Sequence, residues 1–411
     1  MDFELRVPAR DDGPGFFLPV MTGFGTPEPT EADLEDEYVI WEPERSLGIV
    51  DDGTWVAVTG AFSFELTVPG GAFVPAAGVT MVGVLTTHRR RGMLRTLMVR
   101  QLDDIAEAGE PLAVLTASES SIYRRFGFGL AASSCRLDLE SARTQLVQPS
   151  RAGGRCRLVR TADMVEPLTA AYEACRRVRA GAVTRPPGYW ERLQRDRSSW
   201  RGGASAMHWL VHEDDNARPD GFCTYRVKEA WPDRVSDGTV FVHDLCGADP
   251  DVEAALWEHV LSVDLTNWVK ALNRPVDDPI RWRVADPRQV RTREVTDWLW
   301  ARALDVPAAL SARTWGSDGT LVLEVVDQFR PQSGGRFRIE ADADGTGTCT
   351  ATSHGPDLTL DQGDLGALYL GGVAPSTLAA AGRMQQDTDG ALARADRLFA
   401  THPAPFCMTM F

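Results

Sequence analysis

The chain has 411 residues and a formal net charge of −15, with 43% hydrophobic and 25% charged residues. This length predicts two or three domains, and the composition is that of an ordinary globular protein. No apolar run reaches about 18 residues, so we expect no transmembrane helix, and the first residues lack the basic and apolar regions of a signal peptide. The acidic balance argues against nucleic acid as a partner and suits a cationic substrate.

The cysteines and histidines predict no metal centre. Seven cysteines are scattered without a C-x-x-C pair, so we expect reduced thiols, a cytoplasmic location and no zinc site. His208 and His212 would share one face of a helix, but the apolar residues between them predict a strand.

The chain up to about Glu140 has the pattern of a mixed α/β domain. Apolar runs, amphipathic spacing and turn residues predict, in chain order, a hairpin over 47–58, strands over 61–68 and 78–85, a helix over 93–108, a strand over 112–117, a short helix over 122–126 and a strand over 130–139. The strand, helix and strand from 78 to 117 should form one βαβ unit with parallel strands.

A glycine-containing linker at 148–154 separates this domain from a second one with the same order of elements. We expect helices over 164–180 and 188–194, a strand pair over 206–211 and 221–227, a strand over 239–245 and a helix over 252–263. The turn before that last helix, 249–253, is acidic and would repel a pyrophosphate. This second copy should therefore not bind a nucleotide-like cofactor.

A third segment begins near Arg291. The expected elements are helices over 295–303 and from Pro307, a strand over 319–326, a hairpin over 336–340 and 347–352, a strand over 358–360, and helices over 362–369, 376–382 and 391–400. The chain then ends in an apolar stretch, which we expect to dock rather than fray.

The most informative stretch joins the strand that ends at Leu85 to the helix that begins near Met93 through a basic, glycine-containing turn. Free N–H groups of the first helical turn, the helix dipole and the arginines make this turn a seat for a pyrophosphate. A solvated basic face or a nucleic-acid patch is the alternative. The sequence has neither G-x-G-x-x-G after the strand nor a P-loop. The spacing of Arg89 and Gly92 is similar to the acyl-CoA signature of GNAT acetyltransferases, with Leu94 where Gly or Ala is usual.

A stretch after the next strand supplies a candidate acid. Tyr123 follows Ala117-Ser118-Glu119, and its hydroxyl can protonate a leaving thiolate. The alternative is a tyrosine that only packs a short helix. A strand bulge near Val84 would free a backbone N–H to stabilise an oxyanion.

Two joint patterns, V-x-V-x-x-x-H-R-R-R-G-x-L-R and A-S-E-x-x-I-Y-x-R-F-G-F, resemble the Eis (enhanced intracellular survival) family of actinobacterial GNAT acetyltransferases. The resemblance covers the whole chain. It implies two tandem GNAT-like domains of mixed α/β structure, the second degenerate, and a C-terminal sterol-carrier-protein-like domain, over 1–147, 155–290 and 291–411. It also implies an acetyl-CoA-dependent N-acetyltransferase, assembled as a hexamer, that acetylates amines of aminoglycosides, polyamines or lysine side chains.

The matched positions imply roles for particular residues. Tyr123 becomes the general acid and the C-terminal carboxylate of Phe411 the base. The implied acetyl-CoA contacts are the pantetheine-side strand, the pyrophosphate turn and a second edge: Val82, Gly83, Val84; Arg90, Arg91, Gly92, Met93, Leu94, Arg95; Ser118, Glu119.

The rival hypothesis is a non-enzymatic protein that senses CoA or binds a lipid in its sterol-carrier-like domain. Such a sensor would need neither Tyr123 nor a free carboxylate at Phe411, and this pair favours the enzyme. Direct attack of the amine requires no nucleophilic cysteine. In agreement with this mechanism, none of the seven cysteines lies in either motif.

Overall fold

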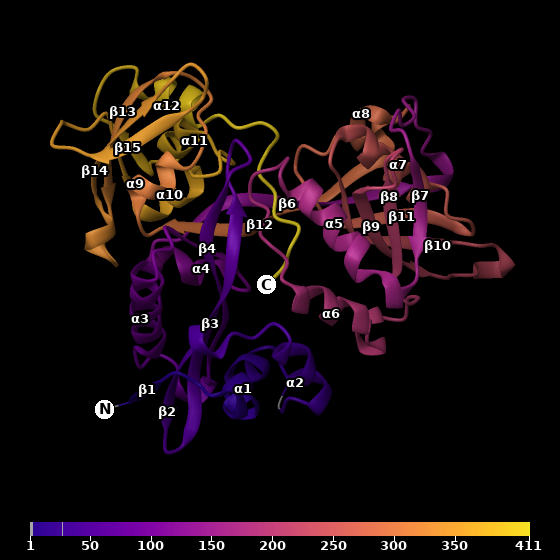
Figure 1. Ribbon diagram of the computed structural model, residues 1–411, viewed down its shortest axis with the longest axis horizontal. Coiled ribbons are helices and arrows are strands. Elements are labelled where there is room, and N and C mark those ends of the chain that lie inside the picture. Colours follow the sequence, from indigo (N-terminus) through magenta and orange to yellow (C-terminus); the bar gives the residue numbers. More distant parts are fainter. Residues whose placement is uncertain (1–2, 27) are drawn as a thin grey trace. The chain divides into compact units, whose positions relative to one another are not determined.

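The computed structural model describes residues 3–26 and 28–411 (Figure 1). Its contacts divide the chain into two compact units. Unit 1 combines the N-terminal segment up to Ala131 with 299–401 and 410–411, and unit 2 contains 132–298 and 402–409. The first and third sequence segments therefore share one compact unit.

The N-terminal part of unit 1 is a mixed sheet in the order β1-β2-β3-β4-β5. Its pairs are antiparallel except β4 with β5, where Ala76 lies opposite Leu112 and Gly78 opposite Val114 in a parallel register. The helix α3 connects these two strands, so the predicted βαβ unit is confirmed. The elements are β1 (Glu4–Arg6), α1 (Gly13–Gly23), α2 (Glu31–Tyr38), β2 (Leu47–Asp51), β3 (Thr54–Thr67), β4 (Phe73–Val84), α3 (Met93–Glu107), β5 (Leu112–Thr116), α4 (Ser120–Tyr123) and β6 (Gly129–Glu140).

Helix α3 forms because its apolar residues recur at helical spacing and bury one face against the sheet. Met93, Leu97, Met98, Leu102 and Ile105 are all buried on this face. The helix ends before Gly109, which has a left-handed φ of 80°. Because Met93 in the first turn belongs to this buried face, the N-terminus of α3 is held against the sheet.

Helices α1 and α2 were not predicted. They are held by a cluster of aromatic rings in which Phe16 and Phe17 contact Trp41 at centroid distances of 5.2 and 4.9 Å. Sequence periodicity missed them because α1 contains Pro19 and is apolar on most sides.

The C-terminal part of unit 1 has a five-stranded sheet in the order β15-β14-β13-β16-β17, in which only β13 and β16 are parallel. Its predicted hairpin and helices are confirmed. The elements are α9 (Val306–Ser311), β13 (Gly319–Val326), β14 (Gly335–Ala341), β15 (Gly347–Ala351), β16 (Leu358–Asp361), α10 (Gln362–Leu368), α11 (Pro375–Ala380), β17 (Met384–Gln386) and α12 (Ala391–Phe399).

The predicted helix over 295–303 is wrong. These residues belong to strand β12 (Val290–Ala303), whose end pairs antiparallel with β5, from Leu299 opposite Thr116 to Ala303 opposite Leu112. A short apolar run does not distinguish a helix from a strand by periodicity, and pairing with β5 decides for the strand. Both faces are buried here, since Trp300 and Arg302 are as covered as their neighbours.

Unit 2 repeats this arrangement of a parallel pair joined by a helix. Its strand order is β6-β11-β10-β9-β8-β7, with β10 and β11 parallel and α7 between them in sequence. The predicted strand pair and helices are confirmed, whereas β7 and β11 were not predicted. The elements are β7 (Arg155–Val159), α5 (Val165–Arg176), α6 (Pro187–Arg195), β8 (His208–Glu213), β9 (Pro219–Lys228), β10 (Gly238–Gly247), α7 (Pro250–Leu261), β11 (Thr266–Arg274) and α8 (Ile280–Arg283).

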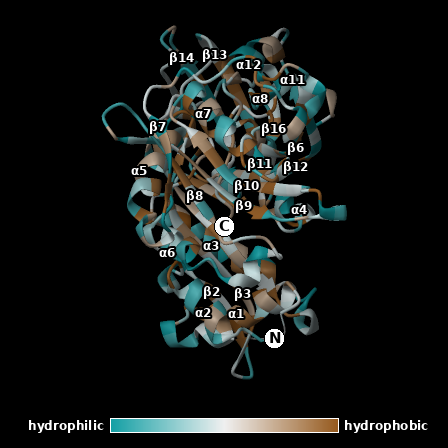
Figure 2. Cartoon of the chain, turned by 90° about the vertical axis from the view of Figure 1, so that its right-hand side faces the viewer, coloured by the Kyte–Doolittle hydropathy of each residue, from teal (hydrophilic) through white to brown (hydrophobic). Residues whose placement is uncertain are grey.

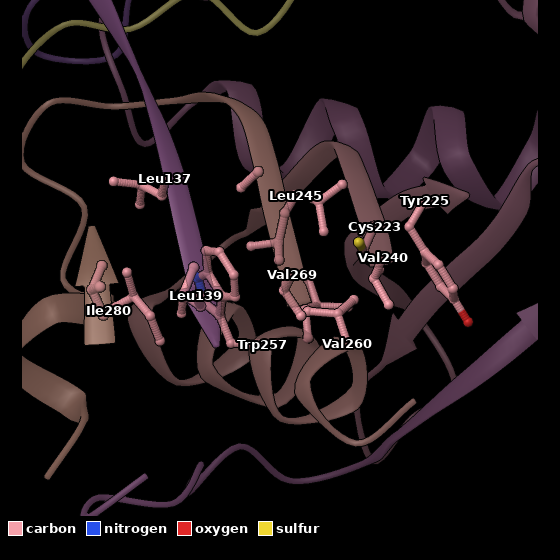
Figure 3. Packing of buried hydrophobic residues seen from close by; sticks show 14 of the residues in the cluster. Leu137, Leu139, Cys223, Tyr225, Val240, Leu245, Trp257, Val260, Val269 and Ile280 are labelled. Carbon is pink, nitrogen blue, oxygen red and sulfur yellow. The ribbon is translucent and has the colours of Figure 1, made fainter. Parts of the chain in front are cut away.

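The core of unit 2 lies between α7 and the sheet. Trp257 and Val260 of α7 are fully buried with Leu139 of β6, Val240 of β10 and Val269 of β11 (Figure 3). Helix α5 shows both brown and teal residues in Figure 2, as expected for a helix with one covered face. Among the described residues, no helix is long and apolar enough to cross a membrane.

Candidate active site

The parallel strands β4 and β5 stay paired only from Ala76 to Gly78 of β4, although β4 continues to Val84. Beyond Gly78 the two strands diverge, and we call the space between Val79–Val84 and the end of β5 the strand opening. A bulge on β4 lies within this stretch: the register with β3 shifts between Val58 and Gly60, and Met81 has a φ of 54°. The bulge predicted from the sequence is present, a few residues before Val84.

The register also decides where the Val84 N–H points. Leu85 N donates to Val56 O at 2.9 Å, so Leu85 forms a hydrogen-bonded pair with β3. Successive residues of an antiparallel pair direct their N–H groups to opposite edges. The Val84 N–H therefore points away from β3, toward the strand opening. Gly83 passes so close to α1 that a Cβ would lie 2.8 Å from the main chain of Pro19.

The predicted pyrophosphate turn closes one end of the strand opening. Gly92 is the N-cap of α3 with a φ of 83° and no side-chain cap, and the first helical bond runs from Thr96 N to Gly92 O at 3.0 Å. The N–H groups of Met93, Leu94 and Arg95 therefore have no partner within the helix. This is the arrangement that binds phosphate at helix N-termini.

The side chains of this turn differ in what they can offer. Arg90 is exposed with a φ of 65°, whereas exposed Arg91 donates to Thr87 O at 3.1 Å. The Met93 side chain is buried, so only its main chain faces the turn. The Arg95 guanidinium lies over the ring of Phe329 at 4.9 Å.

Tyr123 is brought to the strand opening by α4. Its side chain is buried in the cluster that also contains Val79 and Leu115 and is packed by Val82 and Leu94. Burial and the nearby charge of Glu119 raise the pKa of Tyr123 to about 12, so the phenol stays protonated at neutral pH. Ser118 and Glu119 themselves are exposed, between β5 and α4.

Phe411 docks on the opposite face of β5. Thr116 Oγ1 donates to the main-chain oxygen of Phe411 at 2.6 Å, and the Phe411 ring meets Phe64 edge-on at 4.9 Å. Leu115 and Thr116 are consecutive, so their side chains point to opposite faces of the sheet. Tyr123 belongs to the same buried cluster as Leu115, and Phe411 is bonded by Thr116, so we infer that the two residues flank the strand opening from its two faces.

Three domain families match this chain. Two are described as an acetyltransferase (GNAT) domain, over residues 4–131 and 181–303, and the third as a sterol carrier protein domain, over 306–408. An uncharacterized N-acetyltransferase of Streptomyces coelicolor is 43% identical, with 99% of each chain covered. The N-acetyltransferase Eis of Mycobacterium tuberculosis is 33% identical, with 98% of each chain covered. The crystal structure of Eis1 from Mycobacterium abscessus superposes with a TM-score of 0.87 at 35% identity, over 99% of this chain and 100% of that one.

The chain belongs to the Eis family of GNAT N-acetyltransferases. It is thus an N-acetyltransferase with two GNAT-type domains and a sterol-carrier-type domain, as the resemblance implied. GNAT acetyltransferases use acetyl-CoA as donor, and the uncapped turn of α3 and the strand opening of this Eis-family chain fit a pyrophosphate and a pantetheine arm.

The second GNAT copy of this Eis-family chain lacks the open turn. At the start of α7, Asp249 Oδ1 accepts hydrogen bonds from Asp251 N at 2.7 Å and from Val252 N at 3.0 Å. The N–H groups that would meet a phosphate are thus already occupied by a carboxylate. The geometry supports the prediction that this copy is degenerate.

In unit 2, the stretch 402–409 is held by polar groups that the sequence analysis did not single out. Arg185 Nε donates to Thr409 Oγ1 at 2.9 Å, and its two terminal nitrogens pair with Asp244 at 3.0 and 3.1 Å. Phe406 N donates to Ala180 O at 2.8 Å. From the apolar sequence of the chain end we predicted only that it would dock, and not which polar groups would hold it.

The histidines considered for a metal have other partners. His208 stacks on Tyr225 at 4.8 Å, and His212 Nδ1 lies 2.6 Å from Asp220. In the part of the chain that the structure describes, no cluster of His, Cys, Asp and Glu could hold a metal ion.

Proposed function

We propose that this enzyme transfers acetyl from acetyl-CoA directly to a primary amine bound in the same complex. The observation that carries the proposal is the placement of Tyr123 and Phe411 on the two faces of β5 at the strand opening. Acetyl transfer needs a base on the side from which the amine arrives and an acid on the side from which the thiolate leaves. A sensor of CoA needs neither.

The donor side follows from the turn before α3. The free N–H groups of Met93, Leu94 and Arg95, with the positive end of the helix dipole, would hold the pyrophosphate. Arg90, Arg91 and Gly92 complete this turn. Val82 and Gly83 line the pantetheine side, and Ser118 with Glu119 forms the second edge of the same site.

The chemistry needs one proton removed and one supplied. A lysine-like ammonium has a pKa of about 10.4 and must lose a proton before it attacks. The Phe411 carboxylate would accept that proton, directly or through water, and its charge would attract the ammonium. The Val84 N–H would stabilise the oxyanion, and Tyr123, which is protonated at neutral pH, would give its proton to the thiolate.

The acceptors we propose are multiply charged amines: aminoglycoside-like molecules, polyamines and lysine side chains. The net charge of −15 favours the approach of cations. Assembly as a homohexamer and a cytoplasmic location, for which seven free cysteines are suitable, belong to the same proposal.

A turnover screen tests the function. Purified protein is given acetyl-CoA with a polyamine, an aminoglycoside or a lysine peptide, and released CoA thiol is followed. We expect thiol release that depends on the amine and an acetylated amine as product. If acetyl-CoA binds but none of these amines produces thiol, the proposed acceptor classes are wrong.

A further inference from the structure

The turn that carries Tyr123 is too short to hold itself. Helix α4 spans only Ser120–Tyr123, and its N-cap Glu119 makes no side-chain cap bond. A single helical turn is not stable by itself, because nucleation fixes several residues for one hydrogen bond. The position of the phenol therefore depends on the packing of its own ring and on contacts that the neighbouring residues make elsewhere.

The next residue makes such a contact with the sterol-carrier-type part of unit 1. Arg124 Nη2 lies 2.7 Å from Asp361 Oδ2 at the end of β16, and both of its terminal nitrogens lie 3.3 Å from the carboxylate of Asp364 on α10. Asp364 is 1% exposed and also pairs with Arg383. Arg124 thus spans two carboxylates more than 200 residues away in sequence.

The chain after Arg124 is seated on the end of β12 and on α10. Arg302 Nη1 donates to Phe126 O at 2.6 Å. Gly127 has a φ of 80°, and a Cβ there would overlap the Arg302 guanidinium. A Cβ on Gly129 would overlap the main chain of Gly363 on α10. These close approaches restrict how the segment can lie, and Arg124, the residue that follows Tyr123, pairs with the same helix α10.

We propose that Arg124 is a positioning residue for the transfer: by pairing with Asp361 and Asp364 it fixes the α4 turn, so that the Tyr123 hydroxyl is held at the strand opening. The inference rests on the proposed role of Tyr123 as acid. It assigns the sterol-carrier-type domain a part in catalysis that requires no lipid.

The same contacts argue that Arg124 can be replaced without unfolding. Its side chain is 38% exposed, and its pair with the 47% exposed Asp361 is of the solvent-accessible kind that contributes little to stability. Burial and the charge of Asp361 raise the pKa of Asp364 to about 7, and Arg124 opposes this shift. Without Arg124, protonation of Asp364 relieves the repulsion of the two carboxylates, and Arg383 remains beside them.

The first test compares kcat for Arg124→Met, Arg124→Lys and Asp361→Asn. Asparagine at 361 can keep the oxygen that accepts from Asp364 N, while its NH2 group replaces the oxygen that accepts from Arg124, so this ion pair is lost. Because a displacement of about 1 Å can cost roughly 10²-fold in rate, we expect kcat to fall at least about tenfold in Arg124→Met, with the KM for acetyl-CoA unchanged and partial rescue in Arg124→Lys. The control is Arg125→Met, since Arg125 Nε donates only to Ile122 O within its own turn. An unchanged kcat in Arg124→Met overturns the inference.

The second test repeats Arg124→Met in a Tyr123→Phe background. If Arg124 acts through the phenol, the double variant is no slower than Tyr123→Phe alone. If Arg124→Met lowers kcat by the same factor in the Tyr123→Phe background as in the wild type, the positioning role is overturned, while the proposed function stands. A wild-type kcat in Tyr123→Phe alone would instead reject Tyr123 as the acid, and the inference with it. Thermal unfolding of each variant shows that the fold is kept.

Discussion

At the scale of single residues, Tyr123 combines a buried ring with a hydroxyl that we propose as the proton donor. We predict that Tyr123→Phe folds normally but loses about 10²–10⁴-fold in kcat, because the change removes only the proton donor. Steady-state kinetics and acetyl-CoA binding by calorimetry measure the two effects separately.

Tyr225→Phe is a matched control for this substitution. Tyr225 is a buried tyrosine of unit 2 whose pKa burial also raises to about 12, and its hydroxyl lies 3.1 Å from His259 Nε2. The kcat of the Tyr225→Phe variant should equal that of the wild type. If the kcat of Tyr123→Phe also equals the wild-type value, Tyr123 only packs the core.

Arg90 is exposed, whereas Arg91 donates to Thr87 O and Arg95 lies over the ring of Phe329. Arg90→Ala should raise the KM for acetyl-CoA by about tenfold or more, since a charge-assisted hydrogen bond contributes about 1.5–3 kcal/mol. Alanine tolerates the φ of 65° no better than arginine, so the substitution tests the side chain rather than the backbone. Arg151→Ala, in the exposed linker of unit 2, is the control. Equal acetyl-CoA affinity in wild type and Arg90→Ala would place the phosphate elsewhere.

At the scale of elements, α3 and α7 are equivalent helices of the two GNAT copies, but the N-terminus of α3 is uncapped and that of α7 is capped by a carboxylate. Gly92 leaves the first turn of α3 open, while Asp249 fills that of α7. We predict one acetyl-CoA per chain, measured as the stoichiometry of a calorimetric titration. Two equivalent sites per chain would contradict the degenerate second copy.

The elements also show what a sequence can and cannot predict. The βαβ unit around α3 was predictable because its apolar spacing, glycine turn and basic residues agree with one another. Strand β12 was mistaken for a helix because its identity comes from pairing with β5, a contact that no local pattern contains. Likewise, Tyr123 lies beside a recognisable motif, whereas Thr116 and Arg124 gain their roles only from partners hundreds of residues away.

At the scale of the whole molecule, the end of the chain is part of the proposed site. Residues appended after Phe411 would convert its carboxylate into a neutral amide and crowd the oxygen that Thr116 binds. We predict that a C-terminal tag abolishes turnover and leaves acetyl-CoA binding nearly intact, whereas the same tag at the N-terminus is tolerated. Full activity of the C-terminally tagged enzyme would mean that another group is the base.

The pairing of β12 with β5 has a consequence for how the protein is made. Leu112–Leu115 of β5 are completely covered in the folded chain, and one edge of β5 is satisfied only by Leu299–Ala303. During synthesis this apolar edge exists long before its partner, and an unpaired apolar edge is a template for aggregation. The first GNAT domain therefore cannot finish its own sheet. We expect its solubility to depend on a strand that is translated only at the end of the second copy, so the first domain cannot complete its folding before the second copy has been made.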